Sequence, residues 1–158
     1  MAHAPQSLIY AFIALQAFVV LFLLLHDWLP LPPLNDVKAA QAADSRIKLV
    51  ATTLVSTIPY AIALWGCITH IGRDYPAWLE WLLWIGYGAL LLGAFRAWWL
   101  PYLFVSEPAR AARYKMFANT HAFLPEHNGV RPNTLHVIFH IVALATFVFA
   151  IWFALSVR

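Results

Sequence analysis

Four apolar stretches, each long enough to cross a lipid bilayer, constrain this chain more than any other feature of its sequence. A helix needs about 20 mostly apolar residues to span the hydrocarbon core. Hydrophobic residues make up 63% of the 158 residues and charged residues 11%, whereas an ordinary soluble domain is about 25% charged. We therefore predict an all-α membrane protein, with a single transmembrane domain over residues 1–158 folded as an antiparallel four-transmembrane-helix bundle.

The ends of the spans are marked by prolines, glycines and polar residues. We expect the four transmembrane helices at residues 7–28, 47–71, 78–104 and 133–157. Prolines follow the first span, and they remove backbone donors and push the preceding residues out of the helical region. The segment from Gly72 to Pro76 is so short that it predicts a tight turn between two antiparallel helices.

A short amphipathic helix on the membrane surface is predicted over residues 107–118, between the third and fourth spans. Pro108 suits its first turn, and basic residues alternate with apolar ones after it. Residues 119–132 contain two prolines and a glycine and should form a loop. Asn133 is well suited to cap the last span.

The distribution of basic residues predicts the orientation. With four spans, both termini share one face, and the two longer loops share the other. The loop face carries seven Lys and Arg residues and the terminal face two, so the positive-inside rule puts loops 30–46 and 105–132 in the cytoplasm and both termini outside a plasma membrane. No run of adjacent basic residues suits nucleic acid. Membrane lipids, a second copy of the chain or the subunits of a membrane complex are the expected partners.

Five of the seven histidines fall on the predicted loop face, namely His26, His121, His127, His136 and His140. His136 and His140 are four residues apart, so on a helix their imidazoles lie on one face and can share a metal ion. His26, His121 or His127 could supply a third ligand. The sequence does not determine the identity of the cofactor. A divalent metal is the first candidate and haem is the second. Hydrogen-bonded structural histidines are the alternative, since the H-x-x-x-H pattern is common.

Arg96 is the one charged residue well inside a span. A charge there costs about 2.5–3.5 kcal/mol, so we expect a partner, Asp27 or Glu126, or a role in binding an anion. Extension of its long side chain to the headgroups is the alternative. A ridge of small residues shares its helix and should face the bundle, and its members are Ala89, Gly93 and Ala97.

The amino end of the last span is a candidate anion site, because unpaired backbone N–H groups and the helix dipole favour negative charge there. An ordinary capped helix beside a headgroup-binding arginine is the alternative. The candidate substrate-binding residues are Arg131, Asn133 and Glu126. The candidate catalytic residues are His136, His140 and Arg96.

These features support three classes of function. The first is an enzyme or cofactor-binding protein whose histidine-rich site at the cytoplasmic interface takes an anionic or lipid-like molecule from the bilayer. The second is a non-catalytic subunit or assembly factor of a membrane complex, in which the small-residue ridge packs against a partner. The third is a small transporter that works as an oligomer. The sequence leaves open whether the protein is an enzyme.

Overall fold

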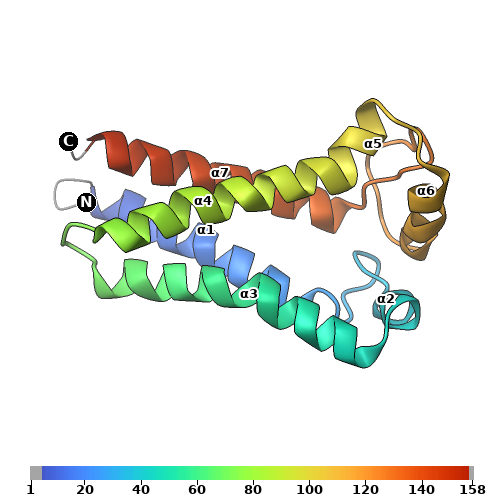
Figure 1. Cartoon of the computed structure of the whole chain (residues 1–158), viewed down its shortest axis with the longest axis horizontal. Helices are drawn as coiled ribbons and strands as arrows, with labels where there is room; N and C mark the ends of the chain where they lie inside the picture. Colours follow the sequence, from blue (N-terminus) through green and yellow to red (C-terminus); the bar gives the residue numbers. More distant parts are fainter. Residues whose placement is uncertain (1–4, 157–158) are drawn as a thin grey trace.

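The computed structural model describes residues 5–156, and within that range the chain is helical and has no β-strand. The long helices are α1 (Gln6–Leu25), α3 (Arg46–Thr69), α4 (Ala77–Ala94) and α7 (Thr134–Ser156) (Figure 1). A π-helical turn, η1 (Phe95–Trp99), continues α4 into α5 (Leu100–Leu103). The two longer loops contain α2 (Val37–Ala43), α6 (Pro108–Tyr114) and a 3₁₀ turn, η2 (Lys115–Phe117).

Four segments of the described chain are long and apolar enough to cross a membrane, and they are Gln6–Leu25, Arg46–Thr69, Ala77–Leu103 and Thr134–Leu155. The spans predicted from the sequence match them closely. The predicted end of the last span, at residue 157, lies outside the described residues.

The clearest difference is at the end of α1, which stops at Leu25 rather than at residue 28. Asn35 accounts for this early end. Its amide nitrogen donates to the carbonyl of His26 and to that of Leu29, each at 2.8 Å. Carbonyls held by a side chain from a following loop do not need helical partners, so the chain can turn there.

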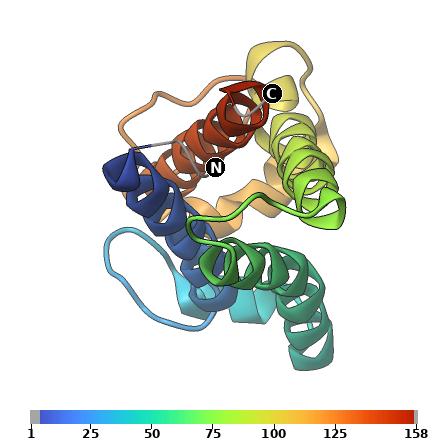
Figure 2. The ribbon, with the colours of Figure 1, turned by 90° about the vertical axis from the view of Figure 1, so that its left-hand side faces the viewer.

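The long helices pack side by side. α1 packs between α3 and α7, and α7 packs against α4. α1 begins and α7 ends at one end of the molecule, and α2 and α6 lie at the opposite end (Figures 1 and 2). α3 and α4 contact each other less than these other pairs do, and Figure 1 shows them diverging toward α2 and α6.

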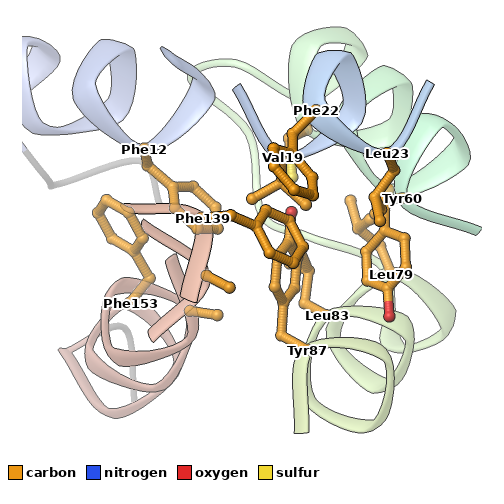
Figure 3. Close-up of a cluster of buried hydrophobic side chains, with 14 of the residues drawn as sticks. Phe12, Val19, Phe22, Leu23, Tyr60, Leu79, Leu83, Tyr87, Phe139 and Phe153 are labelled. Atoms are coloured by element: carbon orange, nitrogen blue, oxygen red, sulfur yellow. The ribbon is translucent and has the colours of Figure 1, made fainter. Parts of the chain in front are cut away.

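Aromatic side chains fill the space between α1, α4 and α7 (Figure 3). The ring of Phe22 stacks on that of Phe139 with their centroids 4.0 Å apart, and Phe12 meets Phe153 edge-on at 5.2 Å. In a lipid environment such van der Waals packing, rather than exclusion of water, holds helices together. This packing holds α1 and α7 together, and both helices contribute residues to the site described below.

Pro101 explains the π-helical turn η1. Proline has no N–H group, so the carbonyl of Ala97 loses the helical bond it would receive four residues later. The N–H of Leu100 donates to the carbonyl of Phe95, five residues back, which also leaves the carbonyl of Arg96 without a helical donor. Two adjacent carbonyls are therefore available near the end of this span.

α6 satisfies both carbonyls. Arg110 Nη1 donates to the carbonyl of Arg96 at 2.5 Å and to that of Ala97 at 3.1 Å, and the Tyr114 hydroxyl also donates to Ala97. The Tyr114 ring stacks on Trp98 with centroids 4.5 Å apart. Within the predicted segment 107–118 the chain forms α6 and η2, and α6 is anchored to the π-helical turn.

Candidate functional site: a histidine-lined cavity

A cavity of 620 Å³ lies between the four long helices, at the end near α2 and α6. This volume falls within the range of small-molecule sites. Its polar lining residues are His26, Asp27, Thr52, Thr53, Ser56, Tyr60, Arg113, His136 and His140. Its apolar lining residues are Phe22, Leu23, Ala89, Leu90, Gly93, Ala94, Ala97, Trp98 and Phe139.

The small-residue ridge of α4 and η1 lines this cavity instead of packing against a helix. Gly93 is exposed, and a Cβ atom built on it would meet no other atom within 4 Å. The ridge was predicted to face the bundle; Ala89 and Gly93 instead lie at the exposed edge of the cavity. The small side chains leave the space that becomes the cavity.

Three of the five predicted histidines meet in this cavity. The ring centroids of His26 and His136 are 5.7 Å apart, and those of His136 and His140 are 6.3 Å apart. Trp98 lies against two of them, with its ring centroid 4.6 Å from that of His136 and 6.3 Å from that of His140. Nothing in the sequence pattern singles out Trp98 from the other tryptophans.

Asn133 fixes the orientation and tautomer of His136. The Nδ1 atom of His136 lies 2.7 Å from Oδ1 of Asn133, and the main-chain N–H of His136 donates to the same oxygen at 3.0 Å. An amide oxygen only accepts hydrogen bonds, so Nδ1 carries the proton and donates. In the neutral ring Nε2 is then unprotonated and can act as an acceptor or base. The predicted cap of the last span by Asn133 is confirmed by the second of these bonds.

His26 closes one side of the cavity next to a carboxylate. Its Nδ1 atom donates to the carbonyl of Phe22 at 2.9 Å, and its ring stacks on the Phe22 ring with centroids 4.5 Å apart. Its Nε2 atom lies 3.3 Å from Oδ2 of Asp27. Protein acceptors thus face both ring nitrogens of His26, which makes it a less available base than His136.

His140 has an unsatisfied nitrogen. The residue is 7% exposed, and its buried Nδ1 atom has no hydrogen-bond partner among the described residues. Leaving a buried polar group unpaired costs about 1–3 kcal/mol. Such exceptions in a folded protein call for an explanation. His140 itself lines the cavity, with this nitrogen buried beneath the surface.

His121 and His127 do not join the other three histidines. Both are exposed, and each ring is held in the loop before α7: Nδ1 of His121 lies 2.7 Å from Oγ1 of Thr134, and Nδ1 of His127 lies 2.5 Å from the carbonyl of Tyr102. In the part of the chain that the structure describes, no three His, Cys, Asp or Glu side chains are grouped so as to hold a metal ion. The predicted metal site, in which His136 and His140 share an ion with His26, His121 or His127 as a third ligand, therefore has no support among the described residues.

Arg96 lies outside the cavity. Its side chain is exposed and forms no ion pair with Asp27, Glu126 or any other residue described by the structure. Gly93 and Ala97 on either side of it line the cavity, whereas Arg96 does not. Its main-chain carbonyl, rather than its guanidinium, makes the described contact, with Arg110.

The predicted anion site is also divided. Glu126 and Arg131 line a separate cavity of 210 Å³ under α6, and Arg131 donates to the carbonyl of Ala122 at 3.4 Å. Asn133 is fully buried, and its amide nitrogen donates to the carbonyl of Leu34 at 3.4 Å. Asn133 therefore positions His136, and its own side chain is already occupied by protein groups.

An ion pair that the sequence did not reveal crosses the mouth of the cavity. Arg113 of α6 lines the cavity, and its Nη2 atom donates to Oδ2 of Asp44 at 2.6 Å. Asp44 also pairs with Lys48, four residues along the chain. The hydrogen bond from Lys48, together with the Arg113 guanidinium, holds the pKa of Asp44 below its usual range. Asp44 and Lys48 have a recognisable helical spacing, but nothing local in the sequence points to Arg113.

The cavity combines groups suited to a small molecule with both polar and apolar parts. His136 and His140 offer nitrogen atoms, Thr52 and Ser56 offer hydroxyls, and Arg113 brings a positive charge to the mouth. The aromatic rings supply flat apolar walls. Comparisons with protein-family models, curated proteins and solved structures find no match to this chain.

Proposed function

We propose that this chain is a multi-pass membrane protein that binds a small, lipid-like molecule in its histidine-lined cavity. In this proposal the four long helices cross the plasma membrane as an antiparallel bundle. The end of the bundle that carries α2, α6 and most of the basic residues faces the cytoplasm. α6 lies on the membrane surface in contact with anionic lipids.

The observation that carries the proposal is the opening of the cavity between α3 and α4. Thr52 on α3, and Ala89 and Gly93 on α4, line the cavity and are exposed. In a bilayer this side of the bundle faces lipid. A molecule dissolved in the membrane could therefore enter sideways, with its apolar part between α3 and α4 and its polar head among the histidines.

The chemistry of the histidines defines the polar head. His136 presents an unprotonated Nε2 atom, which accepts a hydrogen bond, and His140 has an unpaired Nδ1 atom. We propose a head that carries a hydroxyl or another hydrogen-bond donor. If the bound molecule reacts there, His136 is the candidate general base, because its Nε2 atom is the unprotonated nitrogen of the ring.

Copurification of the native ligand tests this function. The protein would be extracted in polymer nanodiscs, which retain membrane lipids, and the retained small molecules would be measured by mass spectrometry. Gly93→Phe should fill the cavity, and His140→Gln should remove the unpaired Nδ1 atom. We expect both to lower the retained amount about tenfold, equivalent to ~1.4 kcal/mol of binding.

His70→Gln is the matched control, because His70 follows α3 at the other end of the bundle and does not line the cavity. It should retain the ligand as wild type does. Equal retention in all variants, or a wild-type protein carrying no molecule beyond bulk lipid, would refute the proposal.

A second candidate function is that of a subunit of a membrane complex, and the uneven burial of the spans favours it. The span windows of α3 and α4 are 28% and 17% buried, against 33% and 39% for α1 and α7. A partner helix could then cover the opening beside Gly93. Cross-linking in native membranes tests this reading: a protein partner bound at α3 and α4, lost in Gly93→Phe, would support it over the first.

A further inference from the structure

A second group of buried polar side chains lies in the bundle between the cavity and the opposite end of the molecule. Gln16 of α1, Cys67 of α3 and Tyr87 of α4 are each 0% exposed. The Cys67 thiol lies 3.6 Å from Oε1 of Gln16. The hydroxyl of Tyr75, from the turn between α3 and α4, lies beside the same thiol. Three helices and a turn thus direct polar groups into one small region.

Three of these polar atoms have no hydrogen-bond partner among the described residues: Nε2 of Gln16, the hydroxyl of Tyr75 and the hydroxyl of Tyr87. Buried polar groups in folded proteins are nearly always paired, with protein atoms or with ordered water. A buried water makes about three hydrogen bonds to such groups. Unpaired donors and acceptors gathered in one place therefore indicate a site for ordered water.

The group is continuous with the histidine cavity. The ring of Tyr87 meets that of Tyr60 edge-on, with centroids 5.2 Å apart, and both are drawn in Figure 3. Tyr60 lines the cavity, and its hydroxyl donates to the carbonyl of Gly86 at 2.9 Å. His140 also lines the cavity, and its unpaired Nδ1 atom is buried behind that lining. The buried group therefore adjoins the cavity through the contact between the rings of Tyr87 and Tyr60.

The group is also continuous with the other end of the bundle. Tyr75 lines a small cavity together with Asp74 and Glu80, at the end of the molecule away from α2 and α6. That cavity has a volume of 40 Å³, which is enough for a water molecule. Carboxylates at this position can take up protons from solvent and release them again.

We propose that Gln16, Cys67, Tyr75 and Tyr87 hold a chain of ordered water that carries protons between Asp74 and Glu80 at one end and the histidine cavity at the other. Each water or tyrosine hydroxyl accepts a proton on an oxygen lone pair and releases its own proton to the next group. One proton enters at the carboxylates, one arrives at a histidine nitrogen, and the histidine then releases a proton to solvent at the end with α2 and α6, so that no proton accumulates and no electron moves. Gln16 positions water through its amide and does not itself relay the proton.

Proton flux into liposomes tests this path. The purified protein would be reconstituted with a pH-sensitive dye inside the vesicles, with the membrane potential clamped by potassium and valinomycin. Wild type should acidify the interior faster than empty vesicles do after an acid jump. Tyr87→Phe removes one relay hydroxyl with little change in packing, and it should lower the flux to that of empty vesicles. Tyr10→Phe is the matched control, because the Tyr10 hydroxyl is exposed on α1, where it accepts from Gln6.

A second measurement tests directly whether water reaches the Gln16 side chain. In water-edited solid-state NMR of protein labelled with ¹⁵N-glutamine, the side-chain amide of Gln16 should gain magnetisation from water, as that of exposed Gln41 does. A dry Gln16 amide would overturn the proposal. So would a wild-type flux no greater than that of empty vesicles, or a Tyr87→Phe flux equal to that of wild type. Because these tests do not involve the cavity ligand, their failure would leave the proposed function standing.

Discussion

Oδ1 of Asn133 accepts two hydrogen bonds from His136, one from its main-chain N–H at 3.0 Å and one from its ring Nδ1 at 2.7 Å. One oxygen atom thus caps α7 and sets the tautomer of the central imidazole of the cavity. The Asn133 amide nitrogen donates to Leu34, so the same side chain also ties the loop before α2 to the site.

Asn133→Ala should therefore have two separable effects. Loss of the cap should lower the free energy of unfolding by about 1 kcal/mol or more. Loss of the acceptor should let His136 populate the other tautomer, which ¹⁵N chemical shifts of the ring would report. Asn133→Asp keeps an oxygen at the cap and should preserve the Nδ1–H tautomer. An unchanged His136 spectrum in Asn133→Ala would contradict this account.

The ion pair between Arg113 and Asp44 should give stability that depends on pH. Because the folded-state pKa of Asp44 is lowered, its contribution is complete above the ordinary aspartate pKa of about 3.9 and is lost as the pH falls through the lowered value. Asp44→Asn should thus lower the melting temperature at pH 7, and the difference from wild type should vanish in acid. Glu126→Gln serves as the control, since Glu126 is an exposed carboxyl outside the described ion pairs.

Tyr114→Phe should weaken the attachment of α6 to the π-helical turn. It removes the hydroxyl that donates to the Ala97 carbonyl, at about 1 kcal/mol for a hydrogen bond of this kind. Hydrogen exchange at residues 108–114 should become faster, whereas exchange within α1 should not change. Tyr102→Phe is the comparison, since the Tyr102 contacts with His127 and Asn128 use its main-chain carbonyl. Equal exchange in both variants would count against the role given to Tyr114.

Burial of the Tyr114 side chain gives that prediction a second readout. Burial raises the pKa of the Tyr114 hydroxyl above its usual value of 10. The hydroxyl should therefore remain a donor at pH 10, where exposed tyrosines have begun to ionise. Absorbance titration should show one fewer late-titrating tyrosine in Tyr114→Phe than in wild type. Because the folded-state pKa is raised, its contribution to stability is complete below about pH 10 and falls above it.

Two glycines should respond in opposite ways to the same substitution. A Cβ atom on Gly66 would lie 2.9 Å from side-chain atoms of Leu79 and Trp78, so Gly66→Ala should destabilise the protein by about 1–3 kcal/mol. Gly93 faces the cavity with no atom that close, so Gly93→Ala should be neutral or stabilising by about 0.5–1 kcal/mol. Thermal unfolding of the two variants checks this, and a Gly93→Ala variant less stable than Gly66→Ala would contradict it.

The spans could be predicted from the sequence because their length and hydropathy are local properties. The cap at Asn133 was predictable for the same reason, since its oxygen serves the next turn of its own helix. The pair between Arg113 and Asp44 joins residues 69 positions apart and leaves no local pattern. The partner predicted for Arg96 is not found among the described residues, because whether Asp27 or Glu126 comes within reach depends on how distant segments fold and not on local spacing.

The π-helical turn η1 has one more consequence. An α-helix advances by about 100° per residue, so an extra residue in one turn rotates all that follows by about that angle. Deleting one residue between Ala94 and Trp98 should rotate the Trp98 indole away from His136. The contact between this indole and the imidazole thus depends on the number of residues in the segment as well as on their identity.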